Sequence, residues 1–487
     1  MSMHHYVACD LGAESGRVML GTLDNGRLTL EEIHRFANGP VAVNGSLRWD
    51  VLRIFDELKA GLRKVAARGI KIESISTDSW GVDYVLLRNS EPLLTPPYHY
   101  RDARTDGALE RAFAVVPADE IFAQTGIQFM PINTLYQLLT DQSTRPWALT
   151  AATQFLNIAD YFNWLLCGVA KAEESLASTT QLYDPRHHRW SETLIRKFKL
   201  PQLQPEVVAS GTILGPLLPA IAEETGARGA QVVASCSHDT AAAVAAVPAK
   251  GNGWAYISSG TWSLLGIECP VPIITDKSRH YNFTNEVGYG GSIRFLKNII
   301  GLWIQQECRR AWQKEGRNFT YEQLGALAAQ AASLKALINP NDPRFGKPDN
   351  MPQKIVEFCR QTGQMPPTTE GEFSRCVLES IALLYRKTLE QMEDVTGKPI
   401  KTLHIVGGGS QSVLLNQLSA NATDRTVVTG PAEATATGNI LIQAIALGHL
   451  KDLDELRQVV RNSFAMQTYK PQENWDAAYE RFQKLAA

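Results

Sequence analysis

Asp239 is the residue whose surroundings most favour proton transfer. It stands in the sequence Ser237-His238-Asp239-Thr240, ahead of a run of small apolar residues that is typical of a helix. An aspartate is ionised at neutral pH and can accept the proton of an attacking hydroxyl, and a partly apolar setting raises its basicity. An N-cap at the start of the helix is the alternative interpretation. His238 could orient a sugar or hydrogen-bond within the core.

Two glycine turns could hold phosphate oxygens. The first reads DLGAESGR at residues 10–17, and the second reads YISSGTWS at residues 256–263. Glycines expose backbone N–H groups in concave turns that suit phosphate. Asp10 could hold Mg²⁺ through water, and Arg17 adds a fixed positive charge. Taken singly, each turn is also compatible with an ordinary β-hairpin.

A tryptophan flanked by carboxylates suits a sugar. Trp80 stands beside Gly81 in the sequence DSWGVD, which ends at Asp83. An aromatic face covers the apolar C–H surface of a sugar, while carboxylates accept its hydroxyl groups. Asp102 and Arg104, in a loop further on, are candidates for the same site. The alternatives are a buried core tryptophan and a surface salt bridge between the two loop residues.

A run of three glycines follows an apolar strand at residues 407–412, which read GGGSQS. Successive glycines let a flat ligand such as adenine approach the backbone closely. The run does not match G-x-G-x-x-G, and the chain contains no G-x-x-x-x-G-K-[ST] sequence. A dinucleotide-binding fold and a P-loop are therefore not supported.

Strands and helices that would position these residues can be read from periodicity. Near the N-terminus, apolar runs alternate toward an Asp-Asn-Gly turn at residues 24–26, which is typical of a β-hairpin. A meander followed by a crossover helix and a strand predicts a mixed sheet covered by helices. The expected strands are residues 6–11, 17–23, 28–36, 72–76 and 82–87, and the expected helix is residues 51–67.

The second half of the chain repeats this theme. A strand ends in the Ser-Gly-Thr turn and a second strand returns from it, so that each half carries one strand–turn–strand element. Pro248 and two glycines interrupt an alanine-rich helix and mark a boundary, which predicts domains at residues 1–247 and 248–487. The expected strands are 253–258, 262–267 and 402–406, and the expected helices are 302–310, 321–337, 373–396 and one that runs from the glycine run through Leu418.

Bulk composition excludes several classes of protein. The chain has 487 residues, 44% hydrophobic content and a net charge of −2, without a run of five like charges. Two or three globular domains are expected, and neither nucleic acid nor a membrane surface is indicated as a partner. The seven cysteines are scattered, which disfavours a zinc site or a secreted disulfide framework, and Cys359 and Cys376 are expected to be free thiols. A cytoplasmic monomer is the expectation.

The order of these motifs resembles the FGGY family of carbohydrate kinases. The resemblance implies an α/β fold of two ribonuclease H-like (actin-like ATPase) domains, each a mixed sheet flanked by helices, with a cleft between them. Two residues depart from the pattern, because Glu14 and Asn421 replace a small polar residue and an aspartate. The segments that carry the resemblance are residues 10–20, 32–38, 78–87, 100–107, 126–138, 237–244, 258–266, 282–303, 338–345 and 404–418.

The resemblance also implies roles for individual residues. The N-terminal domain would bind the sugar and supply Asp239 as the catalytic base, and the C-terminal domain would bind ATP. The implied sugar contacts are Gly81, His238, Asp239 and Thr240, to which the residue chemistry adds Trp80, Asp83, Asp102 and Arg104. The implied ATP contacts are Ala13, Glu14, Ser15, Gly16, Arg17, Thr261, Asn298, Gln306 and Gly408, with Mg²⁺ near Asp10.

The activity implied is ATP-dependent phosphorylation of L-rhamnulose to L-rhamnulose 1-phosphate. L-Fuculose, xylulose, ribulose and glycerol are alternative acceptors, because discrimination over one methylene amounts to only about 1–3 kcal/mol. A non-catalytic ATP-driven clamp is an alternative of another class. Glycoside hydrolysis by paired carboxylates would leave the two phosphate-type turns unexplained.

Overall fold

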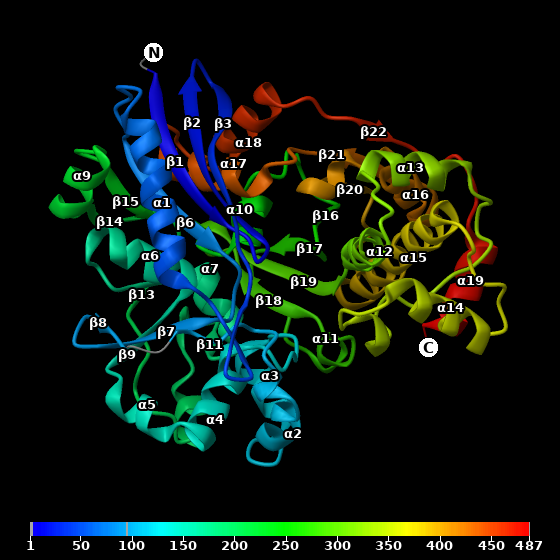
Figure 1. The fold of residues 1–487 in the computed structure, drawn as a ribbon, viewed down its shortest axis with the longest axis horizontal. Coiled ribbons are helices and arrows are strands. Elements are labelled where there is room, and N and C mark those ends of the chain that lie inside the picture. Colours follow the sequence, from blue (N-terminus) through cyan, green and yellow to red (C-terminus); the bar gives the residue numbers. More distant parts are fainter. Residues whose placement is uncertain (1–2, 94–95, 487) are drawn as a thin grey trace. The chain divides into compact units, whose positions relative to one another are not determined.

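The computed structural model describes residues 3–93 and 96–486. Contacts divide the chain into two compact units (Figure 1). Unit 1 comprises Met1–Ala246, Glu268–Leu296 and Ala434–Phe464, and unit 2 comprises Val247–Ile267, Lys297–Glu433 and Ala465–Ala487. The first change of unit follows Ala246, beside the boundary expected at residues 247 and 248. Two later segments, Glu268–Leu296 and Ala434–Phe464, also belong to unit 1, so the units are not two continuous halves of the chain.

Unit 1 is built on a six-stranded mixed sheet of order β14-β15-β6-β1-β2-β3. The first three strands form the predicted meander, and β2 turns into β3 through Asn25 and Gly26, both with positive φ. Strand β1 pairs in parallel with β6, and β6 pairs in parallel with β15. The bounds are β1 (His4–Leu11), β2 (Ser15–Asp24), β3 (Arg27–Ala37), β6 (Ser74–Ser79), β14 (Thr212–Pro216) and β15 (Gln231–Ala234).

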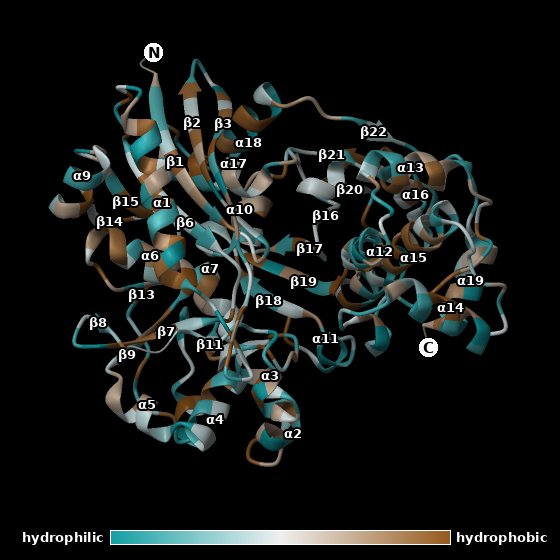
Figure 2. Ribbon diagram, in the orientation of Figure 1, coloured by the Kyte–Doolittle hydropathy of each residue, from teal (hydrophilic) through white to brown (hydrophobic). Residues whose placement is uncertain are grey.

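Helices cover both faces of this sheet. Val18 of β2 packs against Gly61 of α1 (Val51–Ala66), whereas Gly21 packs against Ile440 of α17 (Ala434–Ala446). Residues an odd number apart on a strand point to opposite faces, so α1 and α17 lie on opposite sides. Helix α6 (Ile158–Cys167) contacts β6 and β15, is buried along almost its whole length and is coloured mainly as hydrophobic (Figure 2).

Helix α10 (Asp239–Ala245) packs against α17 at very short range. A Cβ atom added to Gly438 would lie 1.8 Å from the carbonyl oxygen of Ala242. Real Cβ atoms do not approach a backbone oxygen so closely, so only glycine permits this crossing. The position of α10, and of the aspartate at its start, therefore depends on a residue almost two hundred positions later.

In the remainder of unit 1 the sequence predicted only one strand, at residues 82–87. This strand corresponds to β7 (Tyr84–Arg88). A three-stranded sheet of order β8-β7-β9 packs with short helices around its own apolar core. The bounds are β4 (Val41–Val43), β5 (Ser46–Arg48), β7 (Tyr84–Arg88), β8 (Glu91–Pro92), β9 (Gln154–Asn157), β10 (Ala172–Glu173), β11 (Tyr183–Asp184), β12 (Arg189–Trp190), β13 (Val207–Val208), β18 (Thr284–Val287), α2 (Ala108–Phe113), α3 (Ala118–Thr125), α4 (Thr134–Thr144), α5 (Pro146–Ala151), α7 (Glu174–Ala177), α8 (Glu192–Lys197), α9 (Pro219–Thr225), α11 (Asp276–His280) and α18 (Leu453–Ser463).

Unit 2 repeats the plan of unit 1. Strands β16 and β17 form an antiparallel hairpin, and β16 pairs in parallel with β20, which pairs in parallel with β21. The chain changes unit within β17 and again within β19 (Ile293–Ile300). The other bounds are β16 (Trp254–Ser259), β17 (Trp262–Cys269), β20 (Thr402–Val406), β21 (Thr426–Thr429), β22 (Thr468–Tyr469), α12 (Trp303–Lys314), α13 (Tyr321–Gln330), α14 (Met351–Gln361), α15 (Glu370–Thr396), α16 (Val413–Thr423) and α19 (Asp476–Leu485).

One helix is shorter than its sequence pattern predicts. The expected helix at residues 321–337 ends at Gln330, the last residue of α13. Glu379 of α15 accepts hydrogen bonds from the Ser333 hydroxyl at 3.0 Å and the Leu334 backbone N–H at 2.8 Å. These tertiary bonds hold Leu334 at a positive φ, which no helix accommodates. Among the described residues, no helix is long and apolar enough to cross a membrane.

Candidate active site

Asp239 is the first residue of α10, and His238 occupies the N-cap position. The N-cap interpretation of Asp239 is therefore wrong by one residue. Its Oδ1 accepts hydrogen bonds from the Thr240 backbone N–H at 2.5 Å and the Thr240 hydroxyl at 3.1 Å. The side chain of Asp239 is 31% exposed, whereas Thr240 is buried. A carboxylate that is anchored at one oxygen and still open to solvent can accept a proton from a bound substrate.

The loop before α10 is held by a buried glutamate. Oε2 of Glu173 accepts the Ser237 backbone N–H at 2.9 Å and the Ser175 hydroxyl at 2.5 Å. The Ser175 hydroxyl oxygen in turn accepts the His238 backbone N–H at 3.2 Å. Burial raises the pKa of Glu173, and its hydrogen bonds oppose that rise. These contacts fix the backbone from which Asp239 projects.

Two further carboxylates lie at the ends of neighbouring strands. Asp10 of β1 and Asp78 of β6 are partners in the parallel register, and both are buried. Burial raises the pKa of Asp78 well above its usual range, and the nearby carboxylates Asp10 and Asp239 raise it further. Asn439 of α17 donates to Oδ2 of Asp78 at 2.5 Å. Asp78 was predicted only as one of the carboxylates that flank Trp80, and its place beside Asp10 comes from the parallel pairing of β1 and β6.

These carboxylates fit a hydrated magnesium ion. Oδ1 of Asp78 is buried and has no hydrogen-bond partner, and Asp10 is ion-paired with Arg17 across β1 and β2. Mg²⁺ prefers oxygen ligands and keeps several waters, so one or two carboxylates suffice. Within residues 3–93 and 96–486, no group of three His, Cys, Asp or Glu side chains forms a ready metal site. The donor set matches a cation held mainly through water and substrate.

The first glycine turn is a tight loop between β1 and β2. The Gly12 N–H donates to the Ser15 carbonyl at 3.0 Å, and the Asn38 side chain donates to the Gly12 carbonyl at 2.8 Å. A Cβ atom on Gly16 would lie 2.2 Å from the Phe36 ring, so packing explains this glycine. Glu14 is exposed and Ala13 is half-buried. The extra carboxylate therefore points to solvent at the tip of the loop.

The Trp80 region is a buried hydrogen-bonded cluster. Trp80 is only 7% exposed, and its ring centroid lies 4.0 Å from that of Trp49. Both indole N–H groups donate to Oδ2 of Asp83, at 2.6 Å from Trp49 and 3.1 Å from Trp80. The Gln137 amide donates to the other oxygen of Asp83 at 2.9 Å. The core interpretation of Trp80 is confirmed, and sugar contacts by Trp80, Gly81 and Asp83 stay predictions.

Asp83 predicts a pH dependence of stability. Burial raises its pKa to about 6, against the hydrogen bonds from Gln137, Trp49 and Trp80. The folded state then binds more protons than the unfolded state between about pH 4 and pH 6, so the free energy of unfolding falls as pH rises through this window. The shift corresponds to about 3 kcal/mol. In Asp83→Asn the fall in the free energy of unfolding between about pH 3 and pH 7 should be smaller by about that amount, as measured by urea unfolding at these two pH values. An equal fall in both proteins would contradict the assignment.

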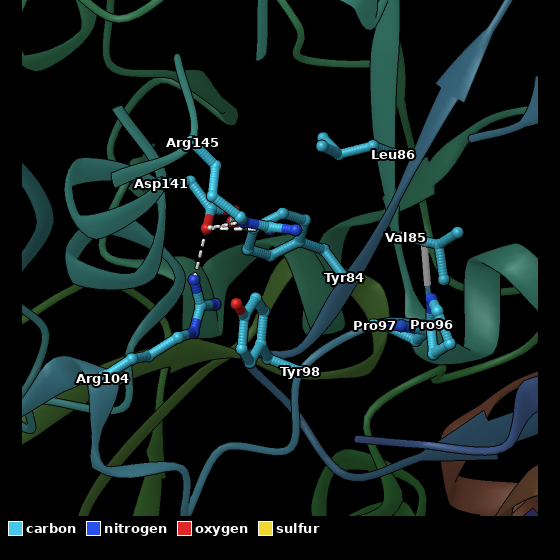
Figure 3. Close-up of a pocket in the computed structure, with 9 residues that line it drawn as sticks. All are labelled: Tyr84, Val85, Leu86, Pro96, Pro97, Tyr98, Arg104, Asp141 and Arg145. Atoms are coloured by element: carbon cyan, nitrogen blue, oxygen red, sulfur yellow. Dashed lines mark hydrogen bonds and ion pairs between the residues drawn. The ribbon is translucent and has the colours of Figure 1, made fainter. Parts of the chain in front are cut away.

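Asp102 and Arg104 do not form the surface salt bridge considered as an alternative. Asp102 is buried and accepts the backbone N–H groups of Leu47, at 2.6 Å, and Arg104, at 2.9 Å. The guanidinium of Arg104 instead pairs with the fully buried Asp141 and lies 3.9 Å from the centre of the Tyr98 ring. Figure 3 shows Arg104 and Arg145 converging on Asp141 beside Tyr98. Both predicted residues thus stabilise the loop in which they lie.

The second glycine turn and the glycine run meet within unit 2. A Cβ atom on Gly407 would lie 3.0 Å from the Ser259 carbonyl, and one on Gly409 would lie 2.0 Å from the Ser259 hydroxyl. Gly408 between them is exposed, and a Cβ atom there would meet nothing within 4 Å. Packing therefore accounts for two of the three glycines. Only Gly408 is free to approach a ligand.

Thr261 links this turn to α12. Its carbonyl oxygen accepts the backbone N–H groups of Gly301, at 3.2 Å, and Trp303, at 3.1 Å. Gln306 follows on α12, and its Oε1 is buried without a hydrogen-bond partner. Asn298 lies on β19 and is half-buried. The predicted nucleotide residues of unit 2 thus belong to contiguous elements, and their facing the loop at residues 12–16 across a cleft stays a prediction.

Comparison with protein families identifies the class of protein that carries these elements. Residues 5–246 match the N-terminal domain of the FGGY family of carbohydrate kinases, and residues 255–447 match its C-terminal domain. The chain therefore belongs to the FGGY family of carbohydrate kinases. Among curated relatives, it is 43% identical to a rhamnulokinase of Bacteroides thetaiotaomicron, over 98% of both chains. It is 40% identical to a rhamnulokinase of Bacillus subtilis, over 96% of both chains.

Solved structures confirm the fold. A ligand-bound xylulose kinase from Lactobacillus acidophilus aligns with a TM-score of 0.80 at 17% identity, covering 99% of this chain and 96% of that one. Plasmodium falciparum glycerol kinase with ADP aligns with a TM-score of 0.79 at 13% identity, covering 99% and 97%. The predicted class, α/β with two ribonuclease H-like domains of the actin-like ATPase type, is correct.

Proposed function

We propose that this protein transfers the γ-phosphoryl group of ATP to L-rhamnulose, giving L-rhamnulose 1-phosphate and ADP. Relatives that are 39–43% identical over nearly the whole chain carry the name rhamnulokinase, which supports this choice of ketose. The structural observation that carries the proposal is Asp239, a partly exposed carboxylate anchored by Thr240 beside the buried Asp10 and Asp78. Phosphorylation of a sugar hydroxyl requires a general base, which Asp239 would supply, and a cation on the phosphate oxygens, for which Asp10 and Asp78 would supply ligands.

Positioning and charge compensation do most of the work in phosphoryl transfer. Asp239 accepts the proton of the sugar's primary hydroxyl as that oxygen attacks the γ-phosphorus. Arg17 and backbone N–H groups of residues 13–16 hold phosphate oxygens from unit 1. Thr261, Asn298, Gln306 and Gly408 hold the nucleotide from unit 2. Closure of the two domains over the substrates would exclude water, which otherwise competes as an acceptor.

The acidic group suits magnesium bound with the nucleotide. Asp10, through water, and the unpartnered Oδ1 of Asp78 are the oxygens that would hold the ion. When bound, Mg²⁺ supplies positive charge that offsets the phosphate oxygens. Arg17, which pairs with Asp10, is near enough to neutralise the carboxylate when the ion is absent.

Domain roles and cellular setting belong to the same proposal. Residues 1–247 would bind the sugar and residues 248–487 the nucleotide, and direct sugar contacts by Gly81, His238 and Thr240 are part of it. The protein would act as a monomer in the cytoplasm, where all seven cysteines, including Cys359 and Cys376, would stay reduced, as the free thiols of the structure suggest.

Gly408 offers a test of the nucleotide site that does not disturb the fold. Because a Cβ atom at Gly408 would meet nothing within 4 Å and the residue is exposed, Gly408→Val should change the melting temperature by no more than about 2 °C. A branched side chain would obstruct adenine, so the KM for ATP should rise about 10-fold, equivalent to about 1.4 kcal/mol, at an unchanged KM for the ketose. Gly407→Val is the contrasting variant, which should lose stability because Gly407 has a φ of +81°. An unchanged KM for ATP would remove Gly408 from the site.

An acceptor panel tests the proposed reaction itself. ADP release is measured with L-rhamnulose, L-fuculose, L- and D-xylulose, L-ribulose and glycerol, and the product is identified by mass and by NMR. The largest kcat/KM should belong to L-rhamnulose, with phosphate on its C1 oxygen. If another acceptor had a higher kcat/KM, that acceptor would be the preferred substrate, and the proposed phosphoryl transfer would still stand. ATP turnover that no sugar stimulates would favour the clamp.

A further inference from the structure

A buried ion pair lies against the imidazole ring of His238, on the side of the ring away from Asp239. Glu286 of β18 and Arg294 of β19 are register partners in an antiparallel pair. Arg294 is fully buried and Glu286 is 4% exposed. Nη2 of Arg294 lies 3.1 Å from Oε2 of Glu286 and 3.1 Å from Nδ1 of His238. No role in the reaction described above uses either residue.

The pair is stable in its charged form. Although burial acts to raise the pKa of Glu286, the positive charge of Arg294 is the largest effect that opposes it, and the pKa lies below its usual value. A guanidinium stays protonated in proteins, so both members are ionised and neutralise each other. Nε of Arg294 also donates to the Val287 carbonyl at 3.2 Å, which fixes the plane of the guanidinium. The ring of His238 therefore meets a rigid hydrogen-bond donor.

This contact decides where the ring carries its proton. A guanidinium has donors and no acceptor, so Nδ1 can bond to Nη2 only through its lone pair. The Glu286 oxygen, at 3.4 Å, is further from Nδ1 than the arginine nitrogen is. A neutral imidazole without a proton on Nδ1 carries it on Nε2. Nε2 lies 3.3 Å from Oδ1 of Asp239.

We propose that Glu286 and Arg294 are positioning residues that hold His238 as the neutral tautomer protonated on Nε2. The Nε2–H group then joins the two Thr240 donors on Oδ1 of Asp239, which leaves Oδ2 to accept the hydroxyl proton. Three charged groups, Asp239, Glu286 and Arg294, face the ring, and only Arg294 among them is a hydrogen-bond donor. The effect on catalysis rests on the proposed function, whereas the tautomer does not.

The tautomer is measured directly by proton–nitrogen correlation NMR of the full-length protein labelled at histidine nitrogens. The His238 signals are assigned by their loss in His238→Gln. Near neutral pH, wild type should show an unprotonated Nδ1 and a protonated Nε2, and Arg294→Met should shift the proton to Nδ1 or charge the ring, because Glu286 is then released. A proton on Nδ1 in wild type, an imidazolium, or an Arg294→Met spectrum like that of wild type would overturn the inference.

Kinetics supply the second readout. Arg294→Met should lower kcat by roughly 10- to 100-fold, the size expected for a misplaced catalytic group, at an unchanged KM for ATP. Arg294→Lys, which keeps a charged donor, should recover part of this loss. The Glu286→Gln/Arg294→Met double variant should also recover part of it, because no carboxylate then remains on the Nδ1 side of the ring. Arg279→Met removes the partly exposed pair with Asp276 and should behave as wild type.

The outcomes separate the inference from the proposed function. If wild type phosphorylates the ketose and a folded Arg294→Met keeps full kcat, the positioning role is wrong and the function stands. If wild type phosphorylates no sugar, the function fails and the NMR spectrum still decides the tautomer. If Arg294→Met does not fold, the wild-type NMR spectrum tests the tautomer, and the kcat of Arg294→Lys tests the positioning role.

Discussion

Replacing Asp239 with asparagine should lower the turnover number for L-rhamnulose by at least about 100-fold. Asparagine has nearly the same shape, and its amide oxygen can still accept the Thr240 N–H that Asp239 accepts at 2.5 Å. It cannot accept a proton from the attacking hydroxyl, because an amide is not basic near neutral pH. The start of α10 should stay folded while proton transfer is lost. A coupled assay of ADP release at saturating ketose and ATP measures the effect.

Asp276→Asn is the matched control for this substitution. Asp276 is also the first residue of a helix, α11, and its side chain is 98% exposed. The same change of charge at the same helical position should leave turnover within about 2-fold, since exposed helix-terminal charges contribute only about 0.3–1 kcal/mol. If Asp239→Asn kept near-normal turnover and a normal melting temperature, Asp239 would not be the base.

Replacing Gly438 with alanine should destabilise the protein by about 2 kcal/mol or more. Alanine favours a helix over glycine by about 1 kcal/mol, so an unconstrained position would gain stability. At Gly438 the new methyl group would lie 1.8 Å from the Ala242 carbonyl oxygen, and α10 and α17 must separate to admit it. Overpacking of this kind costs about 1–3 kcal/mol, and more where backbone must move. Urea unfolding followed by circular dichroism measures the loss.

Gly325→Ala is the matched control, and here we expect the same substitution within a helix to stabilise the protein. Gly325 lies within α13, and a Cβ atom there meets nothing within 4 Å. Stability should therefore rise by about 0.5–1 kcal/mol. Because α10 begins with Asp239, Gly438→Ala should also lower kcat in the fraction that remains folded. Stability gained in both variants would show that the two helices adjust freely.

Local signals in the sequence were sufficient for part of each main sheet. They predicted β1, β2, β3 and β6 in unit 1 and β16, β17 and β20 in unit 2, but not β14, β15, β18, β19, β21 and β22. The Asp-Asn-Gly turn predicted the β2–β3 hairpin, and β20 has the bounds that its apolar run predicts. Alternating and helical spacing of apolar residues indicates an element with one buried face, and the predicted elements are of this kind. Between residues 103 and 230 most helices are short, as α2, α8 and α9 are, and α6 is buried along almost its whole length. Neither kind gives a clear apolar periodicity, and none was predicted.

The sequence offers a signal for a candidate site residue that lies in a recognisable turn, but not for residues that come together only when distant strands pair. Asp239 precedes a visible helix, and Gly408 stands in a visible glycine run. Arg294 lies near His238 only because β18 and β19 pair in one register, and Asp78 lies beside Asp10 only because β1 and β6 are parallel. No local pattern encodes those registers. Trp80 and Arg104 show the converse, since residue types that suit a sugar also serve buried networks.

Helix α17 supplies the first sheet with polar partners from near the C-terminus. Gln443 accepts a hydrogen bond from the Ser74 hydroxyl at 2.6 Å and donates to the Val7 carbonyl at 3.1 Å, and Asn439 donates to Asp78. During synthesis on the ribosome, residues 1–246 emerge long before residues 434–464 can join them. A nascent or prematurely terminated chain that lacks α17 thus has all six strands of the sheet but leaves one face uncovered and these polar groups without their native partners. The N-terminal half therefore acquires its native form only when translation is nearly finished.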